Sequence, residues 1–75
     1  MLYQLTMEQT IQLNKFFYPK ELINQAVKDY ESICDIKIID NDQRFIVTLE
    51  LKQPGNLKEV TGEFCNYILA LIKNA

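Results

Sequence analysis

The N-terminal part of the chain alternates apolar and polar residues. Over residues 3–13 the odd positions carry most of the large apolar side chains, and the even positions carry Gln, Thr and Glu. Alternation with period two is typical of a β-strand that buries one face. A hairpin turning near Glu8 and Gln9 would also suit this length, but neither residue favours a tight turn. We therefore predict one strand, most secure from Thr6 to Leu13.

The next apolar pattern has a helical period. Pro19 suits the first helical turn, where its missing N–H needs no partner, and Glu21 suits the positive end of the helix dipole. Apolar residues then recur at steps of three and four as far as Tyr30. We predict a helix over residues 19–30 with a buried face made of Leu22, Ile23, Ala26, Val27 and Tyr30.

Two further alternating stretches flank a run of turn-forming residues. Cys34, Ile36 and Ile38 alternate with charged residues, and apolar residues occupy every second position from Phe45 to Leu51. The sequence Asp-Asn-Asp-Gln at 40–43 separates the two stretches and is typical of a tight turn. The pattern predicts a strand, a tight connection and a strand.

The longest helical pattern lies at the C-terminal end. Asn56 can cap this helix through its side-chain oxygen, and Glu59 can complete a capping box. Gly62 costs about 1 kcal/mol relative to Ala in a helix interior, which predicts a close contact at that position. We predict a helix up to Asn74 whose core face consists of Leu57, Val60, Phe64, Tyr67, Ile68 and Leu71.

A second apolar row runs beside this core face. Cys65, Leu69 and Ile72, called the outer stripe below, recur at steps of four and three residues and therefore share one side of the helix. The two rows together are wider than one side of a small sheet requires. We interpret the outer stripe as half of an interface.

The order strand, helix, strand, strand, helix restricts the assembly. A right-handed crossover makes the first two strands parallel, and the third runs antiparallel to its hairpin partner. If the third strand lies between them, the sheet order is 1-3-2 with both helices on one face. This α+β arrangement is a ferredoxin-like fold without its last strand. The first strand then forms a sheet edge, which another strand could join. The alternative is that a curled N-terminal segment and packing contacts cover both this edge and the outer stripe.

Length and charge exclude several classes of protein. The 75 residues predict a single domain, 1–75, with a small core that a partner surface would help to stabilise. The net charge is −2 and the basic residues are scattered, so no nucleic-acid footprint is present. No apolar run approaches the roughly 18 residues of a membrane span, and the first residues lack the regions of a signal peptide. We expect a cytoplasmic protein with no membrane contact.

The sequence contains little that could support catalysis. It has no His, which removes the usual general base and the commonest metal ligand. Ser32 lies in a helix-to-strand turn, where a structural role outweighs a nucleophilic one. Asp35, Asp40 and Asp42 lack the spacing of a calcium loop, and no Gly-rich phosphate loop exists. We expect no enzymatic activity, no metal and no cofactor.

The two cysteines are too few and too far apart for a disulfide framework or a metal-ligand pair. Cys34 and Cys65 each have apolar neighbours in the sequence. Unpaired Cys packs as a small hydrophobe, so both are expected to be buried free thiols. A redox role is the alternative.

Three adjacent aromatic residues follow the first strand. Phe16, Phe17 and Tyr18 cannot all point into the core, so at least one is expected to be exposed. We expect Phe16 or Tyr18 to touch a partner. Tyr67 is expected in the core with its hydroxyl group at the rim.

Two segments together resemble a known family. They are F-Y-P-K-E-L-I-N-Q-A-V-K-D-Y at residues 17–30 and, after the alternating hairpin, L-K-E-V-T-G-E-F-C-N-Y-I-L at residues 57–69. This layout resembles the HxsD-like proteins, small companions of His-Xaa-Ser peptide systems that are encoded with radical S-adenosylmethionine enzymes. The positions that carry the resemblance are Ala26, Tyr30, Glu63, Phe64 and Asn66.

The resemblance implies an accessory role: binding a precursor peptide or the modifying enzyme, without an iron–sulfur cluster of its own. It supplies no catalytic residues. Glu63 and Asn66, on the polar flank of the last helix, become hypothetical recognition groups, and a solvated helix face is the alternative.

The leading hypothesis is therefore a non-enzymatic binding module that presents a sheet edge and an apolar helix stripe to a peptide or an enzyme partner, as a homodimer. A structural homo-oligomeric subunit without a separate ligand is the alternative, and a small-molecule sensor is less favoured because no polar pocket is evident. The candidate interaction residues are Thr10, Gln12, Phe16, Tyr18, Glu63, Cys65, Asn66, Leu69 and Ile72.

Overall fold

Five elements follow one another in the predicted order β-α-β-β-α. The computed structural model describes residues 8–75, and the part of the predicted first strand at residues 3–7 lies outside the described residues. The elements are β1 (Glu8–Asn14), α1 (Lys20–Tyr30), β2 (Cys34–Asp40), β3 (Arg44–Leu51) and α2 (Leu57–Asn74). All five lie where the hydrophobic pattern places them.

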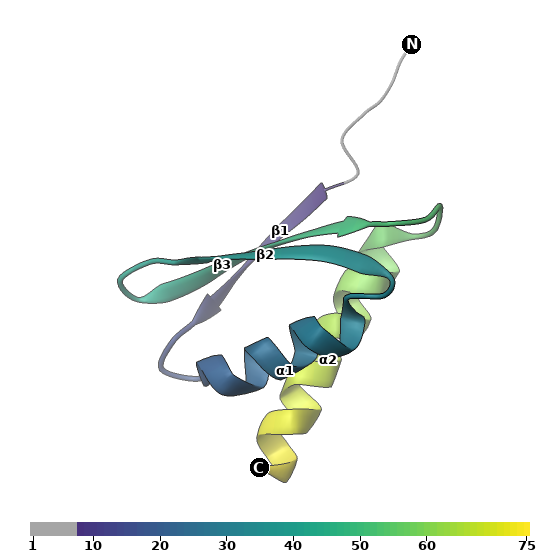
Figure 1. The fold of residues 1–75 in the computed structure, drawn as a ribbon. Coiled ribbons are helices and arrows are strands. Elements are labelled where there is room, and N and C mark those ends of the chain that lie inside the picture. The colour runs from purple at the N-terminus through teal and green to yellow at the C-terminus, as the bar shows by residue number, and fades with distance from the viewer. Residues whose placement is uncertain (1–7) are drawn as a thin grey trace.

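The sheet has β3 at its centre. Its strand order is β1-β3-β2, and β3 runs antiparallel to both neighbours. Both helices lie on the same side of the sheet (Figure 1). The predicted strand order and one-sided helix layer are thus confirmed. The likeness to a ferredoxin-like fold extends to this arrangement of elements and no further.

The core forms where the inward positions of the strands meet the two helices. Alternation determines which strand residues enter it, since successive side chains point to opposite faces. Phe64, the largest fully buried side chain, contributes about 2–3 kcal/mol through removal of its apolar surface from water. The buried hydrophobic cluster consists of Leu13, Ile23, Ala26, Phe45, Val47, Leu49, Phe64 and Ile68.

The helix ends follow the sequence signals. Pro19 is the N-cap residue of α1 in an extended conformation, so the helix begins at Lys20, one residue later than the sequence predicts. Asn56 caps α2, because its Oδ1 atom accepts a hydrogen bond from the Glu59 backbone N–H at 3.0 Å. This bond satisfies one of the free amide groups at the helix start.

The predicted close contact at Gly62 is wrong for the described chain. A Cβ atom placed there would meet nothing within 4 Å, and the residue is exposed. The helix turns this position away from the sheet, which lies under Thr61, Phe64 and Ile68. The conformational cost of this glycine is therefore not offset by a contact inside one copy of the protein.

Thr61 is the one buried polar side chain of the described core. Its Oγ1 atom is buried and forms no hydrogen bond with any described residue. Burial of a hydroxyl group without a partner costs free energy, because its bonds to water are lost and not replaced.

We therefore expect Thr61→Val to raise the free energy of unfolding by about 1 kcal/mol, since valine has nearly the same shape and no buried hydroxyl group. Urea denaturation followed by circular dichroism measures the change. Thr48→Val, which removes a hydroxyl group that is hydrogen-bonded on the solvent face of the sheet, is the matched control and should not stabilise. A loss of stability in Thr61→Val would show that the hydroxyl group has a partner.

Candidate functional site

Among the described residues, the main chain of β1 pairs with another strand on one side only. Lys15 N–H donates to the Gln43 carbonyl oxygen at 3.0 Å, in the register that pairs β1 with β3. In an antiparallel pair the backbone groups of every second residue point to the same neighbour, so Ile11 and Leu13 also bond toward β3. The N–H and C=O groups of the even-numbered residues, Thr10 and Gln12 among them, point to the opposite side, where the described residues place no strand.

The other sheet edge is better protected. β2 carries Asp35, Lys37 and Asp40, and charged side chains on an edge strand disfavour addition of another strand. In β1 the only charged residue is Glu8, and the strand contains neither lysine nor proline. Of the two edges, β1 is therefore the less protected against addition of a strand.

Two side chains of β1 on the solvent face form hydrogen bonds with side chains of the adjacent strand β3. The hydroxyl groups of Thr10 and Thr48 lie 3.2 Å apart, and Arg44 Nη1 donates to Gln12 Oε1 at 2.9 Å. These bonds keep the two predicted site residues, Thr10 and Gln12, over the sheet. What they present at the edge is thus backbone, which pairs with any extended segment whatever its sequence.

Charge is separated along the solvent face of the sheet. Glu8, Glu50 and Asp35 lie directly opposite one another across the three strands. Lys52 Nζ, 3.9 Å from Asp35 Oδ1, is the cation paired with this row in the described chain. The far end of β1 lies beside Arg44 instead, since Asn14 pairs with it. The β1 edge therefore has an acidic end and a basic end.

Contacts with α1 fix the rotation of α2. The Tyr67 hydroxyl group donates to the Asp29 carboxylate, and the Tyr30 ring centroid lies 5.3 Å from that of Phe64 and 5.6 Å from that of Tyr67. The Tyr67 bond, followed by one from Gln25, lowers the pKa of Asp29, while the pKa of Tyr67 is raised by the same carboxylate. The flank of α2 that carries Tyr67 therefore packs against α1.

The outer stripe points away from α1. Residues two positions apart on a helix differ by about 200° in direction, so Cys65 and Leu69 lie on the flank opposite Tyr67. Lys20 Nζ is 3.3 Å from Asp40 Oδ2, which places the start of α1 at the end of β2, whereas α2 contacts β1 and β3. The outer stripe therefore lies on the same side of the molecule as the open edge of β1.

The members of the outer stripe differ in exposure. Leu69 is 49% exposed, Cys65 is half-buried, and Ile72 is half-buried because it packs partly against the core. Leu69 is thus the most available of the three for a partner. We call the open backbone of β1 together with the outer stripe the edge surface.

The remaining candidate residues do not all join this surface. Phe16 is 87% exposed and Phe17 is 64% exposed, with their rings edge to face at a centroid distance of 5.1 Å, whereas Tyr18 packs partly against the core. Glu63 precedes Tyr67 by one helical turn and lies on the α1 flank, where burial and then the Glu63 charge raise the pKa of Tyr30. Asn66 is exposed on the outside of α2.

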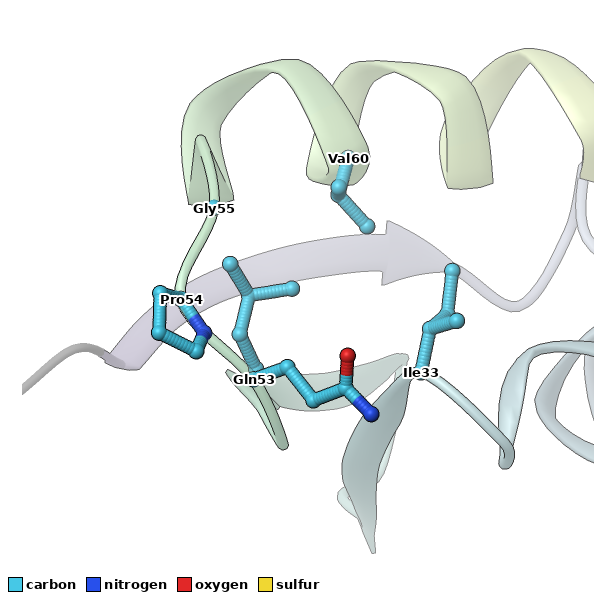
Figure 2. Close-up of a pocket in the computed structure, with 6 residues that line it drawn as sticks. Ile33, Gln53, Pro54, Gly55 and Val60 are labelled. Atoms are coloured by element: carbon cyan, nitrogen blue, oxygen red, sulfur yellow. The ribbon is translucent and has the colours of Figure 1, made fainter.

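An apolar pocket lies beside the first turn of α2, at the N-terminal end of this helix (Figure 2). Its volume is about 190 Å³, and its lining includes Val60 of α2, Ile33 before β2 and the loop that contains Pro54. Ligand pockets typically measure about 300–1,000 Å³ and contain converging polar groups. Figure 2 shows the Gln53 amide as the one polar side chain among the lining residues, so the pocket lacks the groups that would orient a small molecule.

Within residues 8–75, no three His, Cys, Asp or Glu side chains gather as metal ligands would. Asp40 is held by Lys15 and Lys20, which lower its pKa. Of the aspartates tested above against a calcium loop, Asp40 is thus paired with two lysines.

The two thiols differ in access. Both cysteines are free; Cys34 is buried as expected, but Cys65 is only half-buried, because it lies on the flank of α2 that no element of the described chain covers. Burial raises the pKa of both thiols. A raised pKa leaves less thiolate at neutral pH, and the thiolate is the reactive form.

Neither α1 nor α2 is long and apolar enough to cross a bilayer. Comparison of the chain with protein-family models, with curated proteins and with solved structures found no match.

Maleimide labelling should distinguish the two cysteines. We expect Cys65 of the native protein to react while Cys34 stays unmodified. Because the pKa of Cys65 is raised, its labelling rate should still increase with pH where the rate of a fully exposed thiol has already levelled off. Mass spectrometry of timed samples measures both rates, and Cys65→Ser leaves Cys34 alone as the control. Equal rates in the folded protein would contradict the placement of these residues.

Proposed function

We propose that the chain is a non-enzymatic binding module of the cytoplasm that accepts an extended peptide segment at the edge surface. The observation that carries this proposal is the row of outward backbone groups on β1, beside the apolar outer stripe. An added strand would pair with these N–H and C=O groups, while its side chains on the helix side would contact Leu69.

The energetics assign different tasks to the two parts of the edge surface. Each backbone hydrogen bond adds only about 0.5–1.5 kcal/mol net, because the bonds that it replaces were made to water. Burial of Leu69, which is 49% exposed, adds an apolar term that depends on the side chain placed against it. Backbone pairing thus fixes register and direction, and the outer stripe selects among segments.

The resemblance to HxsD-like proteins supports this function and suggests the class of peptide. In that setting the bound segment would be a precursor peptide with His-Xaa-Ser repeats, presented to a radical S-adenosylmethionine enzyme. The exposed pair of Phe16 and Phe17, just beyond the end of β1, would be available to the enzyme partner while the peptide occupies the edge.

The test is a titration of the ¹⁵N-labelled protein with a synthetic peptide of His-Xaa-Ser repeats. We expect the largest amide shifts at Thr10 and Gln12, whose N–H groups become hydrogen-bonded, with smaller shifts at Leu69. The amides of Ile11 and Leu13 should move less, because they remain bonded to β3. Shifts confined to other parts of the protein, or none, would contradict the proposal.

A variant and a second peptide make this titration specific. Gln12→Pro removes an N–H that points to the open side and none that bonds to β3, so it should abolish peptide binding without unfolding the sheet. A peptide of the same length in which proline replaces every second residue cannot pair as a strand and should not bind. If both peptides bind equally, strand addition is not the mode of recognition.

A further inference from the structure

We propose that the edge surface is also a homodimer interface, in which β1 pairs antiparallel with β1 of a second copy about a two-fold axis at Ile11. The two three-stranded sheets then form one continuous six-stranded sheet with all four helices on the same face. A two-fold axis normal to the sheet gives this arrangement, and two-fold symmetry is the commonest among homo-oligomers.

Backbone geometry selects the residues that pair. With Ile11 opposite its own copy, Thr10 lies opposite Gln12 of the second copy, and Gln12 opposite Thr10. These are the residues whose N–H and C=O groups point away from β3. The two reciprocal pairs can form four backbone hydrogen bonds at the centre of the interface.

Charge selects the direction and the register. Antiparallel pairing about Ile11 places Glu8 opposite Asn14 of the second copy, which is itself paired with Arg44. Glu8 and that Arg44 are then two strand spacings apart, roughly 10 Å between Cα atoms, which the two side chains can bridge. Each acidic end therefore meets a basic end, twice by symmetry. Parallel pairing would instead place Glu8 beside Glu8 and extend the row of like charges.

The helices support the same axis. The rotation that makes the β1 strands antiparallel also runs the two α2 helices antiparallel, with their outer stripes facing each other. On the same side of α2, Gly62 follows the outer stripe toward the start of the helix, three residues before Cys65. The side chains on this side are therefore small near Gly62 and large near Leu69. Antiparallel stripes place the small end of one helix beside the large end of the other. The Gly62 surface, which nothing approaches within 4 Å in one copy, then receives a neighbour.

Pairing with a second copy and pairing with a peptide use the same backbone groups, so they exclude each other. The two proposals nevertheless fail separately. A protein that is monomeric at all concentrations overturns the dimer and leaves the peptide titration untouched, whereas a dimer that never exchanges with peptide leaves the interface in place without the proposed function.

Sedimentation velocity over a range of protein concentrations tests the dimer. We expect the wild-type protein to form a concentration-dependent dimer, and Arg44→Glu to raise the dimer dissociation constant at least about tenfold by turning the pairing with Glu8 into repulsion. The double variant Glu8→Lys with Arg44→Glu restores opposite charges across the interface and should recover most of the lost affinity. Lys37→Glu makes the same change of charge on β2 and should have no effect.

The helix contact has its own matched pair. Leu69→Lys places a charge in the outer stripe and should weaken the dimer, while Asn66→Lys places the same charge on the exposed side of α2 and should not. Circular dichroism confirms that each variant is folded, which is expected because Leu69 and Asn66 are both exposed.

Two results would overturn the proposal. One is a wild-type protein that remains a folded monomer at millimolar concentration. The other is a dimer whose affinity neither Leu69→Lys nor Arg44→Glu changes, which would place the interface on another surface. Recovery of affinity in the double charge variant identifies the antiparallel register, because no parallel arrangement brings residues 8 and 44 of different copies together.

Discussion

Backbone hydrogen bonding along β1 is the constraint on which the rest of the structure depends. A central β3 can satisfy only the groups of β1 that point toward it, and these belong to Gln9, Ile11 and Leu13. The alternate groups, on Thr10 and Gln12, have no strand beside them among residues 8–75. Since backbone polar groups are obligatory hydrogen-bonding groups, an unpaired row of them beside apolar surface favours a partner.

The position of α2 makes this edge into a two-part surface. Tyr67 and Asp29 hold one flank of the helix against α1, and Phe64 and Ile68 hold its base against the sheet. The flank that remains lies above the open edge and carries Leu69. Neither part is sufficient alone, because an open edge attracts any strand and a single exposed leucine is ordinary for a protein surface. Their proximity is the basis on which we propose a defined partner.

The elements, their order and the strand order follow from hydrophobic period and connection rules, and the sequence predicts them because both signals are local. The details of the surface require the register. The row formed by Glu8, Glu50 and Asp35 joins residues far apart in the chain, and nothing in their neighbourhoods marks them. The predicted contact at Gly62 is wrong because it rests only on the conformational cost of glycine in a helix, which does not require a contact within one copy. Tyr18 packs on the core and Phe17 is exposed, since the turn after β1 decides which ring points inward.

Hydrogen exchange of the β1 amides tests the central claim, that this edge is open in a single copy and closes only against another strand. In dilute protein, the amides of Thr10 and Gln12 should exchange quickly while those of Ile11 and Leu13 exchange slowly. Raising the protein concentration should protect Thr10 and Gln12 as well. Slow exchange at Thr10 and Gln12 in dilute monomer would show that the edge is covered within one copy, and unprotected amides at every concentration would show that no second strand joins it.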